Sequence, residues 1–96
     1  MSRHVPRHDR WTAHGPIEHR SSDGLRAFFE RGAWWAEVPY RLRPESAPPE
    51  ALGAWELHTE RLGPFKRPRN AMVEAERQAT FLQRRHGDRI AIGPGT

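Results

Sequence analysis

The feature that most constrains the fold of this chain is a pattern that occurs twice. In it, a tryptophan-led segment and a glycine-proline pair precede helix-like and strand-like segments. The first copy comprises Trp11 to Ile17 with Gly15-Pro16, Leu25 to Arg31, and Trp34 to Val38. The second copy comprises Trp55 to Leu62, Gly63-Pro64-Phe65, Asn70 to Arg85, and Arg89 to Ile92. Two strand-turn-helix-strand units predict an α+β fold of the order β-α-β-β-α-β, with two helices on one face of the sheet.

The length and composition of the chain predict one small domain. Ninety-six residues are enough for a single core. We expect a flexible basic arm over residues 1–9, one α+β domain over residues 10–93 and a tail over residues 94–96. Hydrophobic residues make up only 35% of the chain, while four Trp and four Phe hold much of the apolar area. The core should therefore be small and aromatic. Because there is no cysteine, neither a disulfide nor a thiolate metal site can stabilise it.

The segment after residue 20 predicts a short first helix. Ser21-Ser22-Asp23 supplies an N-cap and an acidic first turn. Leu25, Phe28 and Phe29 are spaced so that they share one helical face, and Gly32 is placed to end the helix.

The segment from Trp34 to Arg43 predicts a half-buried strand, because hydrophobic and polar residues alternate along it. Its inward face would hold Trp34, Ala36, Val38, Tyr40 and Leu42, and its open face Trp35, Glu37, Pro39, Arg41 and Arg43. Pro39 has no N–H to donate to a neighbouring strand, so we expect this to be an edge strand.

The second half of the chain predicts a strand, a long helix and a closing strand. After a loop from Pro44 to Gly53, the strand alternates Trp55, Leu57 and Thr59, facing inward, with Glu56, His58 and Glu60. The helix would begin at Asn70 and end before Gly87, with an apolar stripe of Met72, Ala75, Ala79 and Leu82. In the closing strand we expect Ile90 and Ile92 to face inward.

Residues 54 to 93 resemble the second half of the sporulation-related repeat (SPOR) family. The resemblance rests on a strand, the turn Leu62-Gly63-Pro64-Phe65, a short basic segment, an alanine-containing helix and a closing strand. Gly15-Pro16-Ile17 would be the counterpart of that turn in the first half. The resemblance implies a ferredoxin-like βαββαβ sheet, and it implies binding of peptidoglycan strands that lack stem peptides.

Catalytic chemistry is sparse in the sequence. His58 lies between Glu56 and Glu60, so it could act as an acid-base group, or the three could form a cross-strand charge ladder with Arg41 and Arg43, which we favour. Leu57-His58 and Phe65-Lys66-Arg67-Pro68 also resemble the C-terminal part of the RNA-cleaving toxins of toxin-antitoxin pairs. That resemblance implies a small endoribonuclease that uses His58, Lys66, Arg67 and Arg69. The histidines His4, His8, His14 and His19 have no nearby carboxylate cluster, so we expect neither a metal site nor a cofactor.

The charged and aromatic residues favour a binding protein that is not an enzyme. The chain carries 16 Lys and Arg against 12 Asp and Glu, a net charge of +4. The expected binding residues are Trp35, Arg41, Arg43 and His58 on the open face, and Arg61, Lys66, Arg67 and Arg69 in a basic turn. Because Glu37, Glu56 and Glu60 should share the open face, we expect docking on a protein or nucleoprotein assembly, as an accessory or inhibitor protein that a mobile element could encode.

The alternative is a nucleic-acid-binding module that uses the basic turn, the N-terminal arm and Trp35. A membrane partner is not expected, because no apolar run approaches the length of about 20 residues that a membrane span needs. We therefore expect a cytoplasmic protein.

Overall fold

A computed structural model describes residues 10–45 and 55–94 of the chain. Within them lie six strands, one α-helix and a short 3₁₀ turn, which are β1 (Trp11–Ala13), β2 (Glu18–Ser21), β3 (Arg26–Glu30), β4 (Ala33–Leu42), β5 (Glu56–Phe65), α1 (Pro68–His86), η2 (Gly87–Arg89) and β6 (Ile90–Ile92). The predicted α+β class is confirmed. The predicted arm over residues 1–9 and most of the predicted loop from Pro44 to Gly53 lie outside the described residues.

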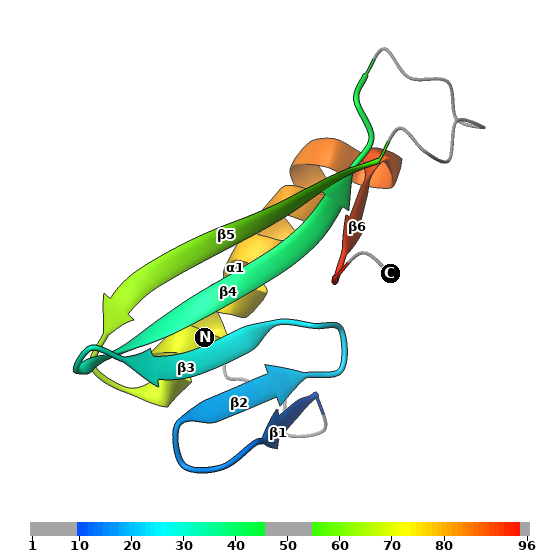
Figure 1. Cartoon of the computed structure of the whole chain (residues 1–96). Coiled ribbons are helices and arrows are strands. Elements are labelled where there is room, and N and C mark those ends of the chain that lie inside the picture. Colours follow the sequence, from blue (N-terminus) through cyan, green and yellow to red (C-terminus); the bar gives the residue numbers. More distant parts are fainter. Residues whose placement is uncertain (1–9, 46–54, 95–96) are drawn as a thin grey trace, which may run out of the picture.

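The six strands form one antiparallel sheet, and α1 packs behind it in the view of Figure 1. The strands β1 to β5 follow one another as a meander, and β6 pairs with β4. On one side β4 pairs along most of its length with β5. On the other side its first half pairs with β3 and its last residues with β6. The central strand of the sheet is therefore β4.

The central position of β4 corrects the prediction that Pro39 marks an edge strand. The pairing of β4 with β3 ends at Glu37, and its pairing with β6 begins at Tyr40. Pro39 lies in the gap between these two neighbours, where its carbonyl oxygen accepts a hydrogen bond of 2.8 Å from Gly93 N. The missing N–H of the proline therefore removes no hydrogen bond between strands.

The predicted first helix is wrong, because residues 26–30 form β3. Arg31 and Gly32 both have positive φ angles, 54° and 78°, and they join β3 to β4 in a two-residue hairpin of the type I′ kind. Before β3, the backbone N–H of Gly24 donates to the carbonyl oxygen of Ser21, and Leu25 N donates to Ser21 Oγ. The residues that resembled a helix cap therefore form a turn, and the predicted βαββαβ order with two helices is not the one observed.

The core lies between α1 and the sheet. The helix contributes mainly small residues, so it can approach the strands closely. Its buried apolar residues are Ala71, Ala75, Ala79 and Leu82, against Leu25, Ala27, Ala36, Val38, Tyr40 and Ile90 from the sheet side. The predicted helical stripe and the inward face predicted for β4 are thus confirmed in the main, with Met72, Trp34 and Leu42 packed at the margin of the core. The helix begins at Pro68, two residues before the expected Asn70, and it has no side-chain cap.

The alternation predicted for β5 is inverted. Tyr40 of β4 lies opposite His58, and Arg41 lies opposite Leu57, so His58 faces the helix side and Leu57 the open side. Leu57 is 68% exposed. Leu62, further along β5, determines which residues of this strand face the helix. It packs against the core and lies opposite the buried Ala36. Because residues two apart share a face, Glu56, His58 and Glu60 lie on the helix side with Leu62.

The first strand is tied to the helix by a buried carboxylate. Glu76 of α1 is 2% exposed, and its Oε2 accepts a hydrogen bond of 2.7 Å from the indole Nε1 of Trp11. Arg10 lies 3.7 Å from the same oxygen, and it also forms an ion pair with Asp23 in the turn between β2 and β3. These contacts hold β1 against the helix.

Candidate functional site

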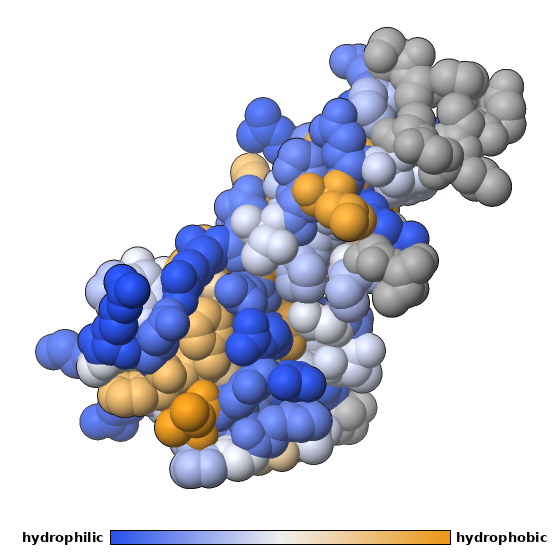
Figure 2. Space-filling model, in the orientation of Figure 1, coloured by the Kyte–Doolittle hydropathy of each residue, from blue (hydrophilic) through white to orange (hydrophobic). Residues whose placement is uncertain are grey.

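The sheet face opposite α1 is the most distinctive surface of the molecule. None of the described elements crosses this open face in Figure 1. Figure 2 shows hydrophobic surface gathered over β3 and the adjoining part of β4, bordered by hydrophilic side chains. The strand pairing places on it Glu18, Arg20, Arg26, Phe28, Glu30, Trp35, Glu37, Arg41, Leu57 and Arg61. Apolar rings and arginines are therefore mixed on one surface.

One end of the open face is built from two aromatic rings and two arginines. Phe28 and Trp35 are directly opposite each other in the pairing of β3 with β4. The guanidinium of Arg61 lies 5.0 Å from the ring centre of Phe28 and 4.9 Å from that of Trp35. Arg26 lies 4.7 Å from the Phe28 ring. Such cation-π contacts hold the guanidinium groups against the rings, and Phe28 beneath them is only 9% exposed.

The orientation of Trp35 is fixed by its neighbours. Its indole Nε1 donates a hydrogen bond of 3.0 Å to the carbonyl oxygen of Glu30. Beneath the ring lies Gly63, at an irregularity of the β4–β5 pairing. A Cβ atom on Gly63 would lie 2.8 Å from Cε3 of Trp35, so only glycine allows the indole to rest there. The face therefore presents a ring that is already held in place.

The carboxylates of this end are all bound by arginines. Glu18 accepts hydrogen bonds from Arg20 at 2.5 Å and from Arg26 at 2.9 Å. These bonds, with that from Arg20 the larger influence, lower the pKa of Glu18 to about 2. Arg26 also donates to Glu37 at 2.5 Å, and Arg61 forms an ion pair with Glu30. The negative charges here are thus neutralised by neighbours in the sheet.

The other end of the open face holds arginines without such partners. The guanidinium groups of Arg41 and Arg43 each lie 5.9 Å from the ring centre of Trp55. Within residues 10–45 and 55–94, no carboxylate forms an ion pair with either arginine, and Arg41 Nε is buried without a hydrogen-bond partner. Arg89 lies beside them, because its Nε donates to the carbonyl oxygen of Arg43 at 3.2 Å.

Of the residues predicted from the sequence, four come together on the open face: Trp35, Arg41, Arg43 and Arg61. His58 does not, because it lies on the opposite face of the sheet. There its ring stacks on Tyr40 with ring centres 5.1 Å apart, and its Nε2 lies 3.4 Å from Glu56. Burial, and to a lesser degree the nearby Glu60, raises the pKa of Tyr40. The placement of His58 removes it from the predicted binding surface.

The basic turn lies just beyond the end of β5. Lys66 and Arg67 connect β5 to α1, and Arg69 lies in the first turn of the helix. All three side chains are exposed. Phe65, which precedes them, packs against the core and is partly buried. Arg61 projects from the open face instead of joining this turn, so the predicted four-residue cluster divides into two parts.

The sequence analysis missed Arg26, Phe28 and Trp55, and it also missed Arg20 and Arg89. Arg26 and Phe28 were assigned to a helix, and Trp55 was assigned to the core. The signal that could have found the first two is Arg31-Gly32, a two-residue hairpin turn between apolar segments. The position of Trp55 on the open face follows from the pairing register of β4 with β5. That register depends on the irregularity at Gly63.

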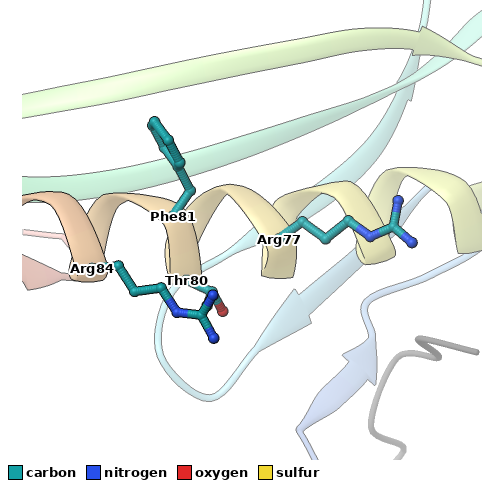
Figure 3. Close-up of a pocket in the computed structure, with 4 residues that line it drawn as sticks. All are labelled: Arg77, Thr80, Phe81 and Arg84. Carbon is teal, nitrogen blue, oxygen red and sulfur yellow. The ribbon is translucent and has the colours of Figure 1, made fainter. Parts of the chain in front are cut away.

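A second surface feature lies on the exposed side of α1. Arg77, Thr80, Phe81 and Arg84 line an open depression of about 270 Å³. Figure 3 shows that Arg84 extends alongside Thr80, while Phe81 projects away from them. Phe81 is 52% exposed.

Two further kinds of site were considered within the described part of the chain. Across residues 10–45 and 55–94, no group of three His, Cys, Asp or Glu side chains could hold a metal ion. In the same ranges, no helix combines the length and the apolar character that crossing a bilayer requires.

Comparison with known proteins leaves the site to be interpreted from its own geometry. No protein-family model, curated protein or solved structure matches this chain.

Proposed function

We propose that this protein binds nucleic acid through the open face of its sheet. The observation that carries the proposal is the layering of arginine on aromatic rings at both ends of that face. Arg61 lies over Phe28 and Trp35, while Arg41 and Arg43 lie over Trp55. Guanidinium groups held on such rings can bind phosphate oxygens with two parallel hydrogen bonds, and a guanidinium plane or the partly exposed Trp35 ring can stack on a base, whereas Phe28 is only 9% exposed.

The balance of charge favours nucleic acid over a protein partner for this face. The arginines Arg20, Arg26, Arg41, Arg43 and Arg61 outnumber the carboxylates Glu18, Glu30 and Glu37 by five to three. Each of these carboxylates is bound by an arginine. The sequence also placed the carboxylates of Glu56 and Glu60 on this face, which favoured a protein partner, but both lie on the helix side of the sheet. The exposed Lys66, Arg67 and Arg69 add positive charge at one edge.

Docking on a protein or nucleoprotein assembly stays a second candidate function. It is supported by the exposed side of α1, where Phe81 lies beside Arg77 and Arg84 in the depression shown in Figure 3. A half-exposed phenylalanine among arginines has the composition of a protein interface. This surface faces away from the sheet, so the two functions do not compete for the same residues.

Fluorescence anisotropy with labelled 20-nucleotide single-stranded and duplex probes tests the proposal. We expect affinity to fall steeply with salt, and Trp35→Ala to weaken binding by about 2 kcal/mol, or roughly 30-fold. Lys66→Ala with Arg67→Ala should weaken binding similarly for all sequences and reduce the salt slope by about one unit per lost phosphate contact.

The matched control is Arg84→Ala with Arg85→Ala, which removes the same charge from the helix. Circular dichroism establishes that each variant is folded before its affinity is compared. If no probe binds at 50 mM salt, or if Trp35→Ala binds as tightly as the unchanged chain, the open face is not a nucleic-acid site. Equal losses in the helix variant and in the Lys66 and Arg67 variant would exclude a role for the basic turn.

A further inference from the structure

The arginines of the open face fall into two groups that differ in what they bind. Arg20, Arg26 and Arg61 each form an ion pair with a glutamate of the sheet. Arg41 and Arg43 form none with the described residues, and each guanidinium lies 5.9 Å from the ring centre of Trp55. Both groups belong to the same face. The strand pairing places Arg20, Arg26, Arg41 and Arg61 there, and Arg43 lies at the same Trp55 ring as Arg41. The difference points to separate roles for the two ends.

The guanidinium groups at the Trp55 end form no hydrogen bond with a described residue, and Nε of Arg41 is the donor that is buried. A guanidinium has five N–H donors, and none of those of Arg41 or Arg43 is bound by a described residue. The contact with the indole limits the orientations of both groups, so less entropy is lost when an anion binds. Arg89 is held beside them by a hydrogen bond from the Arg43 backbone N–H to its carbonyl oxygen, at 2.8 Å. Three positive charges therefore lie together without a counter-charge in the sheet.

We propose that Arg41, Arg43 and Trp55, with Arg89 beside them, form a phosphate-binding subsite. Its ligand is a backbone phosphodiester of the nucleic acid bound by the open face, an identity that rests on the proposed function. A nucleic-acid strand carries one negative charge per 3.4 Å of duplex axis, so a row of arginines without carboxylates matches its repeating charge. The paired arginines at the Trp35 end instead cover Phe28, which is 9% exposed, and Trp35 is the ring that contacts a base.

The spacing of the two ends gives the direction and length of the bound strand. Trp35 and Arg41 are six residues apart on β4, which corresponds to about 20 Å at a rise of about 3.3 Å per residue. An unstacked strand is longer per nucleotide than the duplex rise of about 3.4 Å, so about three to six nucleotides cover that length. The nucleic acid therefore runs along β4, and a dinucleotide is too short to contact both ends at once.

NMR spectroscopy of the full chain tests the subsite directly. The indole N–H resonances of Trp35 and Trp55 are followed while inorganic phosphate is added, with sodium chloride at equal ionic strength as the reference. We expect phosphate to shift the Trp55 resonance while the Trp35 resonance stays within the change that chloride causes. Arg41→Ala with Arg43→Ala should abolish the response at Trp55, and Arg84→Ala with Arg85→Ala should preserve it.

Oligodeoxythymidylates of 2, 8 and 12 nucleotides test the connection between the two ends. We expect affinity to rise at least tenfold between 2 and 8 nucleotides, and the Arg41 and Arg43 double variant to lose that rise. If phosphate shifts Trp55 but no oligonucleotide binds, the subsite stands and the nucleic-acid assignment fails. If oligonucleotides bind while neither phosphate nor the double variant affects Trp55, the subsite is wrong and the proposed function stands.

Discussion

Replacement of Gly63 by alanine would disturb the support of Trp35 from below. Gly63 has a φ angle of +135°, in a region that is open essentially to glycine, and an alanine there is strained by about 1–3 kcal/mol. The new Cβ would also lie 2.8 Å from Cε3 of Trp35 and 3.1 Å from the carbonyl oxygen of Trp34. The indole must move to relieve the contact, and overpacking of this kind costs about 1–3 kcal/mol. We expect Gly63→Ala to lower the free energy of unfolding by about 2–4 kcal/mol.

Gly32→Ala is a matched control for backbone strain without a steric contact. Gly32 also has a positive φ angle, 78°, but a Cβ there would meet nothing within 4 Å. We expect this variant to lose about 1–2 kcal/mol, and the Trp35 indole to keep its position. Urea unfolding followed by circular dichroism gives both free energies, and the Trp35 indole N–H resonance reports the ring.

Two results would refute the reasoning about Gly63. Equal destabilisation by the two substitutions would show that the contact with Trp35 has no energetic effect. An unchanged Trp35 resonance in Gly63→Ala would show that the ring does not depend on the glycine. Loss of oligonucleotide affinity in Gly63→Ala but not in Gly32→Ala would connect the position of the ring to binding.

Two further predictions concern the core and the open face. Leu82 is 4% exposed, so Leu82→Ala should lower the free energy of unfolding, measured in urea, by about 2–5 kcal/mol. Phe81→Ala, at the exposed neighbouring residue, should change this free energy little. Equal losses in the two variants would contradict the placement of Leu82 in the core. Glu18 has a pKa of about 2 in the folded protein against about 4.3 when unfolded, so the unfolded state binds more protons between these values. The stability that Glu18 contributes is therefore present above pH 5 and is lost as the pH falls toward 2. Glu18→Gln should make the decline in unfolding free energy between pH 5 and pH 3 shallower, and an unchanged slope would count against the pairs with Arg20 and Arg26.

The elements that could be predicted from the sequence are those whose periodicity extends over many residues. The alternation of β4 covers ten residues, and the apolar stripe of α1 from Met72 to Leu82 covers about three turns, so neither pattern fits another structure. The segment around Phe28 is too short for this test. Leu25, Phe28 and Phe29 fit one face of a helix, but the segment is also short enough to be a five-residue strand between two turns. The tight turn at Arg31-Gly32 favours the strand over the helix.

The candidate site was predictable where it depended on β4 alone. Trp35, Arg41 and Arg43 share a face because they alternate along one strand. Alternation alone could not show which residues of β5 face the helix. Leu57 and Leu62 are five positions apart, so they lie on opposite faces of the strand, and each would by itself predict a different inward face. The structure resolves the conflict in favour of Leu62, which reaches the core, while Leu57 lies near the end of the sheet. The placement of His58 and Trp55 therefore required the pairing of two strands, which is information that one strand does not contain.

The bond between Trp11 and Glu76 bears on the order in which the chain folds. The two residues are 65 positions apart, whereas the hairpins that build the sheet join neighbouring segments. Closing so long a loop requires that the helix has already formed and docked, so β1 should be secured only after the transition state for folding. Trp11→Phe would then accelerate unfolding and leave the folding rate almost unchanged, a pattern that stopped-flow kinetics in denaturant can resolve. On a ribosome, the first strand to be synthesised would be among the last parts of the sheet to be held in place.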